Sequence, residues 1–289
     1  AGFGASLEAI LPDWSVRTFS LTEVRDRNLQ AETAEYLVSC DFVFSHWASS
    51  DWHEIGTEAL RQRKANVIVL PMFAFRGFHP DMAYLDFDGR AHASPMGPYN
   101  SLIIAAGYRL GLEASHIEQL FNTLVYRRLG YQNEMGASWS LMRDNFAHDG
   151  FAEFMDWSSL ENSCFMYTLN HPKQAALAQL ARAAARRIGA AFVDEADRDV
   201  VDFLSYEFQW PVYPGIADKF GMGNFEFKQY GYPDDPSRKL TLREMIAGSL
   251  EHYRNYPPGL FDNDNVVQTA KVLESLTGVA LAHRQSSVA

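Results

Sequence analysis

Short apolar runs in the first hundred residues predict β-strands. The clearest run covers residues 66–70, where four aliphatic side chains follow one another and Pro71 ends the pattern. Residues 41–45 form a second apolar run, and residues 15–20 alternate between polar and apolar side chains. Runs of this length that are rich in β-branched and aromatic residues are typical of strands that lie inside a sheet.

Helical patterns separate the predicted strands. They cover residues 7–10, 20–38 and 51–63, and the first follows a tight turn expected at the glycine-containing residues 2–6. The helix at residues 20–38 opens with a serine and a glutamate three positions apart, which is the signature of a capping box. Strands that alternate with helices predict an α/β fold, with a mostly parallel sheet and flanking helices over residues 1–97.

From residue 98 onward the pattern becomes mainly helical. Helices are expected at residues 101–112, 115–129, 134–148, 173–188, 242–256 and 265–276, the last of them stopped by Gly278. No long polar linker separates this part from the first. We therefore expect an α/β part at residues 1–97 and a mainly helical part at residues 98–289, packed as one compact unit.

Composition and charge narrow the classes of protein that need consideration. Hydrophobic residues make up 47% of the 289 residues and charged residues 21%, as in ordinary globular proteins. A net charge of −11 disfavours nucleic acid and anionic membranes as partners. Two cysteines, no long apolar run and no visible signal peptide indicate a cytoplasmic protein without a membrane span. The sequence does not predict the oligomeric state.

The loop that follows the strand at residues 66–70 contains the strongest candidates for chemistry. Ligands bind beyond the carboxyl ends of parallel strands, and Arg76, His79 and Asp81 all follow such an end. A histidine is the usual general base near neutral pH, an aspartate could orient it, and an arginine could bind phosphate or carboxylate. The alternative is a structural turn in which Asp81 caps the following segment.

Two further segments add candidates. His46 follows the strand at residues 41–45, so in a parallel sheet it would share an edge with His79; alone, it is better explained as a satisfied, half-buried histidine. Asn170 and His171 precede a predicted helix, where they could cap the helix, bind an anion at its N-terminus, or do both. No group of residues has the spacing of a metal site, so we expect no metal.

Together these segments resemble the WcbI-like family of capsular polysaccharide biosynthesis proteins, which are described as acetyltransferases. The similar segments appear in the family's order, at residues 75–85, 97–112, 127–131, 166–172 and 210–214. They include Phe-Arg-Gly-Phe-His-Pro-Asp at residues 75–81 and Met-Tyr-Thr-Leu-Asn-His-Pro at residues 166–172. The ordered combination is more specific than any one of the segments.

The resemblance implies that coenzyme A or acetyl-CoA is bound and that an acyl group is transferred to a sugar hydroxyl of a polysaccharide acceptor. On this interpretation His79 would deprotonate the hydroxyl and Asp81 would orient it, with His46 as a further catalytic candidate. The candidates for binding the cofactor's phosphates or the sugar are Arg76, Tyr99, Asn100, Asn170, His171 and Ser6.

The chain departs from the family at its beginning. Family members usually open with Gly-Asn-Cys-Gln, whereas residues 2–5 here read Gly-Phe-Gly-Ala, and Ser6 is the nearest residue that could substitute. Three functions therefore stay open. They are an O-acetyltransferase that transfers the acetyl group directly, an esterase-like hydrolase, and a carbohydrate- or coenzyme A-binding protein without catalysis.

Overall fold

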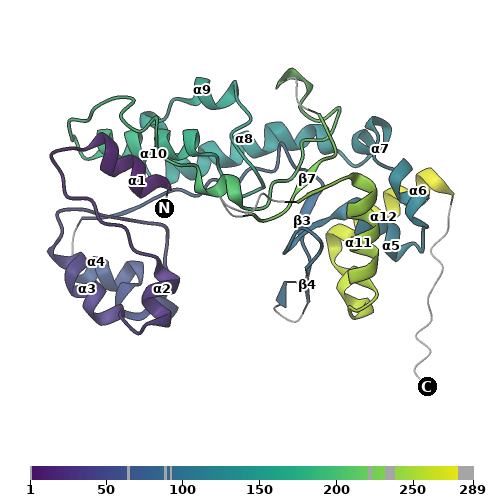
Figure 1. Ribbon diagram of the computed structural model, residues 1–289, viewed down its shortest axis with the longest axis horizontal. Coiled ribbons are helices and arrows are strands. Elements are labelled where there is room, and N and C mark those ends of the chain that lie inside the picture. Colours follow the sequence, from purple (N-terminus) through teal and green to yellow (C-terminus); the bar gives the residue numbers. More distant parts are fainter. Residues whose placement is uncertain are drawn as a thin grey trace. The chain divides into compact units, whose positions relative to one another are not determined.

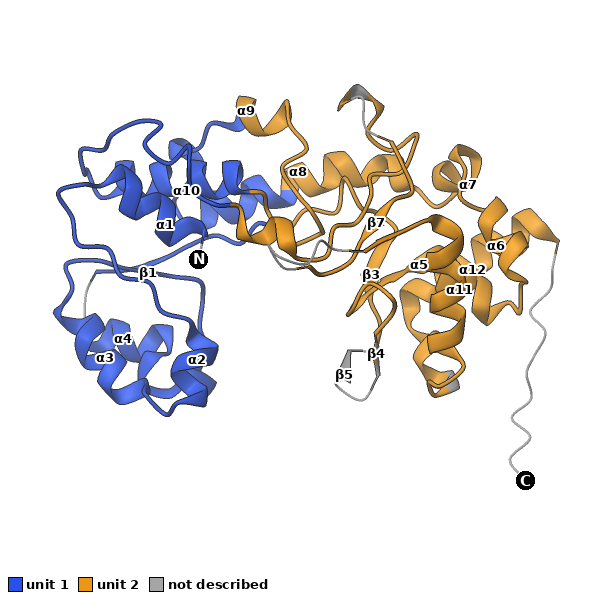
Figure 2. Ribbon diagram, in the orientation of Figure 1, with its two compact units in different colours: residues 1–73, 141–157, 174–201 blue, residues 74–140, 158–173, 202–289 orange. Residues whose placement is uncertain are grey.

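The computed structural model describes residues 2–63, 66–87, 90, 91, 93–220, 223–231 and 238–278. The chain forms two compact units (Figures 1 and 2). Unit 1 comprises residues 1–73, 141–157 and 174–201, and unit 2 comprises residues 74–140, 158–173 and 202–289. The boundary predicted between residues 97 and 98 falls within unit 2.

A small α/β layer occupies the first part of unit 1. Strands β1 (Val43–Ser45) and β2 (Val67–Val69) pair in parallel, as the sequence predicts for neighbouring buried strands. The helices of this layer are α2 (Leu21–Asp26), α3 (Gln30–Ser39), η1 (Ser50–Ile55) and α4 (Thr57–Arg63). Apolar side chains from both strands and these helices, among them Val24, Val43 and Val67, form a core of their own.

The helix expected at residues 20–38 is two helices in the structure. Ser20 does cap its start, accepting a hydrogen bond from the backbone N–H of Glu23 at 3.3 Å. The break falls at Asn28, whose φ of 54° lies in the left-handed region that ends a helix. The predicted helix at residues 51–63 is interrupted in the same way by His53, with a φ of 52°.

The other layer of unit 1 packs helix α1 (Gly2–Ile10) against helix α10 (Gln174–Arg187). The tight turn expected at residues 2–6 is therefore wrong, since these residues are helical. Gly2 permits the close approach, because a Cβ there would lie 2.3 Å from the Gln174 side chain. Residues 15–20, predicted as a strand, have no regular structure. The 3-10 turn η2 (Ala152–Phe154) also belongs to this unit.

Unit 2 combines short antiparallel strand pairs with helices. The pairs are β3 (Met82–Tyr84) with β6 (Tyr99–Ser101), β4 (Asp86–Phe87) with β5 (Arg90–Ala91), and β7 (Phe227–Lys228) with β8 (Lys239–Leu240). The helices are α5 (Leu102–Arg109), α6 (Ala114–Gln119), α7 (Thr123–Arg128), α11 (Leu242–Tyr253) and α12 (Asp264–Thr277). Short 3-10 turns lie at η3 (Phe203–Tyr206), η4 (Asp218–Phe220) and η5 (Pro258–Asp262). Helices α8 (Tyr131–His148) and α9 (Trp157–Glu161) contribute residues to both units.

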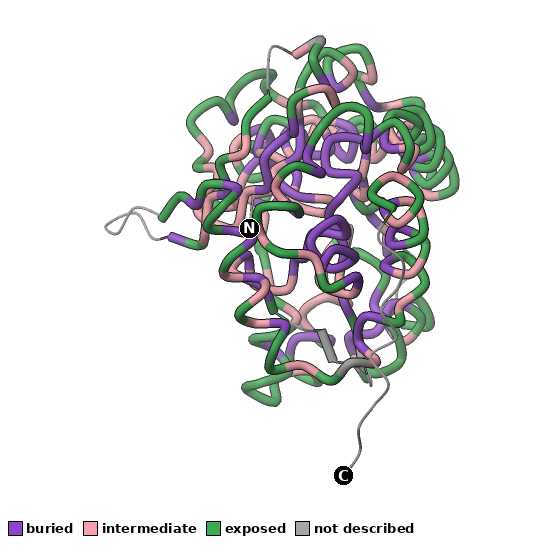
Figure 3. Tube along the Cα trace, turned by 90° about the vertical axis from the view of Figure 1, so that its right-hand side faces the viewer, coloured by how far each residue is buried: buried purple, intermediate pink, exposed green. Residues whose placement is uncertain are grey.

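The core of unit 2 surrounds helix α5, and Figure 3 shows the buried parts of the chain in purple. The first six residues of α5 are all buried, and helices α11 and α12 pack against it.

Helix boundaries in unit 2 follow sequence signals closely: Thr241 and Glu244 form a complete capping box, and Gly278 ends α12 at a φ of 67°. The helix predicted at residues 115–129 is split where Asn122 caps α7.

The structure has the mixed helix and strand content that the sequence predicts, but a mostly parallel sheet is not confirmed. In the described part of the chain the named strands pair two by two, with one parallel pair in unit 1 and three antiparallel pairs in unit 2. The apolar run at residues 66–70 predicts that the strand is buried. It does not predict the size of the sheet, because a buried strand can pair with one neighbour or with two. Among the described helices, none is long and apolar enough to cross a membrane.

Candidate active site

Asp81 lies buried at the N-terminus of helix α5. Its carboxylate accepts hydrogen bonds from the Ile103 N–H at 2.9 Å, the Tyr131 hydroxyl at 2.8 Å and the Tyr213 hydroxyl at 3.0 Å. Its backbone carbonyl accepts from the Leu102 N–H at 2.9 Å. Asp81 thus joins the loop at residues 75–81 to the start of α5, where free N–H groups and the helix dipole favour an anion.

Complete burial raises the pKa of Asp81 from its usual 3.8 to about 6. The donors around the carboxylate, from Ser101, Ile103, Tyr131 and Tyr213, oppose this rise because each stabilises the charged form. Burial has the larger effect on the pKa, because the charged carboxylate loses its contact with water and each hydrogen bond compensates for only part of that loss. The carboxylate is therefore held by the fold and is not presented to solvent.

His79 is also buried, with 2% of its surface exposed. Burial lowers the pKa of its imidazole from 6.5 to about 4, with a smaller contribution from the charge of Lys173. The carbonyl groups of Pro211 and Met166 partly offset the fall, although neither ring nitrogen has a partner at hydrogen-bond geometry. In the described chain no hydrogen bond joins His79 to Asp81, so the predicted orienting contact is absent from this structure.

Arg76 lies in the same loop with its side chain 41% exposed. The guanidinium donates to the Pro80 carbonyl at 3.0 Å, and its Nε lies 3.8 Å from a carboxylate oxygen of Glu134. Gly77 allows the loop to approach helix α8, because a Cβ there would lie 2.9 Å from the Met135 backbone. The loop is therefore fixed against α8, with one partly exposed cation on it.

Four predicted or neighbouring polar residues meet elsewhere in unit 2, around Tyr99. The Tyr99 hydroxyl donates to Asn170 Oδ1 at 3.0 Å and lies 3.3 Å from His171 Nε2. The Asn170 amide donates to the Tyr84 hydroxyl at 3.0 Å. The antiparallel register explains why two phenols meet here, since Tyr84 and Tyr99 are opposite one another on β3 and β6. Tyr84, Asn170 and His171 are each partly exposed. We call these four residues the Tyr99 cluster.

The backbone of residues 168–171 orients the cluster. The Thr168 hydroxyl donates to Asn170 Oδ1 at 3.1 Å and accepts from the His171 N–H at 3.2 Å. Asn170 and His171 are therefore held by a local turn just before α10, and not by the helix itself. The sequence allowed Asn170 and His171 to cap the helix, but in the structure they belong to this turn instead.

The protonation state of the Tyr99 cluster follows from its partial burial. Burial lowers the pKa of His171 and raises the pKa of Tyr99, so both groups are neutral at pH 7. Because Tyr99 donates its proton to Asn170, His171 Nε2 would carry the hydrogen of the imidazole and donate it to the phenol oxygen. This leaves His171 Nδ1 as a basic nitrogen, which is covered and has no hydrogen-bond partner.

The remaining predicted residues lie in other surroundings. Asn100 is buried, and its amide bonds to the Tyr253 hydroxyl and to the Pro98 carbonyl. Ser6 is in unit 1, fully buried, and accepts from Gln174 at 2.7 Å. His46 is also in unit 1, exposed at the end of β1, and its Nδ1 donates to the Leu70 carbonyl at 3.1 Å. Neither Ser6 nor His46 contacts another predicted catalytic residue within unit 1.

Three residues of the site were not among the sequence candidates. Tyr84 belongs to the Tyr99 cluster, Thr168 orients it, and the half-buried Lys173 lies over the Tyr167 ring at 5.2 Å. The pairing of β3 with β6 was the missing signal for Tyr84, because only the register places it opposite Tyr99. Among the described residues, no group of three or more His, Cys, Asp or Glu side chains could hold a metal ion.

Comparison with known proteins assigns this architecture to a family. A family model described as the polysaccharide biosynthesis enzyme WcbI matches residues 5–192 of this chain. That match covers more than half of the sequence, and the chain belongs to the WcbI family of polysaccharide biosynthesis enzymes. No curated protein matches the chain.

A solved structure of a WcbI protein, described as a novel polysaccharide biosynthesis enzyme, has a similar fold. The TM-score is 0.59 at 15% sequence identity, and the similarity covers 83% of this chain and 85% of that one. That protein is described as native and without a disulfide bond between CoA and one of its cysteines. At this identity the likeness concerns the fold alone.

Proposed function

We propose that this protein is an O-acetyltransferase that moves the acetyl group of acetyl-CoA to a sugar hydroxyl during polysaccharide biosynthesis. The observation that carries the proposal is the convergence of a phenol, an amide and a neutral imidazole in the Tyr99 cluster, built from segments that lie far apart in sequence. Family membership supports a sugar substrate, and the similar protein described with CoA supports the cofactor.

In this proposal His171 is the general base. Nδ1 of the neutral ring accepts the proton of the sugar hydroxyl, while Nε2 stays hydrogen-bonded to Tyr99, which fixes the ring. Acetyl-CoA would supply a thioester whose C–S bond breaks as the sugar oxygen bonds to the carbonyl carbon. His171 then returns the proton to the leaving thiolate, so that one acetyl group and one proton exchange places. Because Nδ1 is covered, the groups that lie over it have to move as the acceptor binds.

The cluster offers further groups of the required kind. The amide of Asn170 and the phenol of Tyr84 are partly exposed hydrogen-bonding groups for a sugar or for the oxygen of a thioester. Two partly exposed cations are available for the phosphates of coenzyme A. Arg76 lies within the segment at residues 75–81, and Lys173 directly follows the segment at residues 166–172.

Direct transfer to the sugar is favoured over a covalent acyl-enzyme. Ser6 is fully buried and its hydroxyl is engaged by Gln174, so it is not available as a nucleophile. Burial raises the pKa of the Cys164 thiol, which reduces the thiolate needed for attack. An esterase-like mechanism through either side chain is disfavoured for the same reasons.

The experiment that tests this function has two stages. Isothermal titration calorimetry with coenzyme A should show binding of the order of micromolar affinity, about −8 kcal/mol. Incubation with labelled acetyl-CoA and a polysaccharide acceptor should then transfer the label to the sugar and release the thiol. Absence of coenzyme A binding would remove the acetyl-CoA proposal.

A second candidate is a binding protein without turnover. It is favoured by residues 2–5, which lack the family's Gly-Asn-Cys-Gln turn and lie in helix α1 instead. Coenzyme A binding at micromolar affinity with no acetyl transfer to any acceptor would support this candidate over the enzyme.

A further inference from the structure

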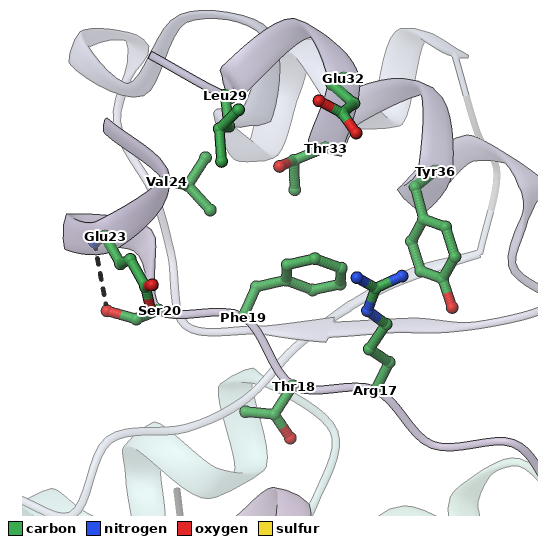
Figure 4. A pocket seen from close by; sticks show the side chains of 10 residues that line it. All are labelled: Arg17, Thr18, Phe19, Ser20, Glu23, Val24, Leu29, Glu32, Thr33 and Tyr36. Carbon is green, nitrogen blue, oxygen red and sulfur yellow. Dashed lines mark hydrogen bonds between the residues drawn. The ribbon is translucent and has the colours of Figure 1, made fainter. Parts of the chain in front are cut away.

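Unit 1 contains a pocket that the proposed reaction does not use. It measures about 270 Å³ and lies between the segment at residues 17–20 and helices α2 and α3 (Figure 4). Pockets for drug-sized ligands measure about 300–1,000 Å³, so this one suits a single small ring and is far too small for a whole coenzyme A.

One wall of the pocket holds an arginine in place without neutralising it. The Arg17 guanidinium lies 5.0 Å from the centre of the Phe19 ring and 4.8 Å from the centre of the Tyr36 ring. Figure 4 shows the guanidinium between the two rings. Arg17 is exposed, and within the described chain it has no ion pair and no hydrogen bond, so its N–H groups are oriented and accessible to a ligand.

The opposite wall, from helix α3, presents oxygen atoms that are also unused. Thr33 is 6% exposed, lines the pocket, and has no hydrogen-bond partner for its hydroxyl among the described residues. Glu32 beside it lines the pocket without an ion pair in the described chain.

The charges decide which class of ligand fits. Glu23 is ion-paired with Arg27 at 3.0 Å, so the free charges are the positive Arg17 and the negative Glu32. They balance, and this disfavours a phosphate or another strongly charged group. The pocket therefore combines a donor, an acceptor, a hydroxyl and the Phe19 ring, which match a neutral ring rich in hydroxyl groups.

We propose that this pocket of unit 1 binds a neutral sugar ring. Its hydroxyls donate to the Glu32 carboxylate and accept from Arg17, and its C–H face contacts the Phe19 ring. In a polysaccharide biosynthesis enzyme such a site would hold a sugar residue of the glycan. The proposal does not depend on acetyl transfer, because it concerns unit 1 alone.

Saturation-transfer NMR and titration with the whole chain test the proposal. The probes are the methyl pyranosides of glucose, galactose and mannose, with adenosine as a separate arm for a ribose-bearing ligand. At least one pyranoside should bind with a Kd of the order of 1 mM. Arg17→Met and Glu32→Gln should each weaken that binding about tenfold, as expected when a charged hydrogen bond is lost.

Matched variants show whether the sugar binds in this pocket or elsewhere on the protein. Arg61→Met removes another guanidinium of unit 1, which lies over Trp47 at 5.7 Å outside the pocket, and should leave binding unchanged. Binding at the Tyr99 cluster instead would be weakened by His171→Ala and not by Arg17→Met, and that result would overturn the proposal. The proposal is overturned if no pyranoside binds, including the case in which adenosine alone binds. It is equally overturned if Arg17→Met and Glu32→Gln bind as tightly as Arg61→Met.

Discussion

Two histidine-containing regions of unit 2 differ in how far water reaches them. The loop at residues 75–81 places His79 and Asp81 in the interior, where Asp81 is bonded to the start of α5 and His79 has no partner. The Tyr99 cluster contains a histidine that is neutral as well, but it is partly exposed and joined to a phenol. His79 is therefore enclosed by the protein, whereas His171 is partly exposed and is the base in the proposed reaction.

Replacing the two histidines separately tests this difference most strongly. His171→Ala should lower the rate of acetyl transfer by about a hundredfold to ten thousandfold, the usual contribution of a general base. The exposed His116 provides the control, and His116→Ala should leave the rate unchanged. Steady-state kinetics with acetyl-CoA provide the measurement. If His171→Ala is as active as His116→Ala while a folded His79→Phe variant is inactive, the base is His79 and our assignment is wrong.

Removing the buried carboxylate should act on stability first. Asp81→Ala leaves the hydroxyls of Tyr131 and Tyr213 and the Ile103 N–H without an acceptor. The free energy of unfolding should fall by about 4 kcal/mol, since each buried donor without a partner costs about 1–3 kcal/mol. Urea unfolding measures this, with the exposed Asp144→Ala as control. A loss below about 1 kcal/mol would show that Asp81 does not hold the start of α5.

The pH dependence of stability should separate the two buried groups. Asp81 has a pKa of about 6 when folded against 3.8 normally, so its contribution is full below about pH 4 and is lost as the pH rises through 6. His79 has a pKa of about 4 against 6.5, so its contribution is full above pH 6.5 and is lost as the pH falls through 4. Between these limits the two effects oppose one another.

Single variants should separate the contributions of Asp81 and His79 to the pH dependence of stability. From pH 7 to pH 4.5, Asp81→Asn should lose stability relative to the unmodified protein, and His79→Phe should gain it, each by about 2 kcal/mol. Urea unfolding at the two pH values compares them. Parallel pH profiles for all three proteins would contradict the burial of these groups.

The smallest effect is expected within the Tyr99 cluster. Tyr84→Phe removes one hydrogen bond from the Asn170 amide and keeps the ring. Acetyl transfer should fall about fivefold, equivalent to about 1 kcal/mol, because Asn170 is still held by Tyr99 and Thr168. Tyr108→Phe, whose ring packs in the core near Tyr253, is the control. An effect as large as that of His171→Ala would mean that Tyr84 itself takes part in proton transfer.

Local sequence signals predicted most helices and the parallel pairing of the two buried strands, because caps and apolar runs act over a few residues. Thr241 and Gly278 mark helix ends where they were expected. The break at Asn28 was missed, since a left-handed residue costs little locally and its position depends on packing. The mostly parallel sheet that was expected is not confirmed, because the number of partners that each strand has is decided by contacts between distant segments.

The candidate site was predicted in part. Tyr99, Asn170 and His171 were named from the sequence and do meet, whereas Tyr84 depends on a strand register that no local pattern reveals. Residues 75–81 contain the combination that is typical of a catalytic loop. The sequence could not show that the Asp81 carboxylate is directed to a helix N-terminus and away from His79, because that depends on where α5 begins.

The double attachment of Asp81 to helix α5 bears on how such proteins are identified. Its backbone and side chain both bind the first turn of α5, so a chain that loses this aspartate should lose the fold before it loses any reaction. A search keyed to the segment at residues 75–81 would therefore collect proteins with this architecture, whether or not they catalyse anything. On the proposed mechanism, sorting active enzymes from inactive members would depend on the residues that correspond to Tyr84, Tyr99 and His171.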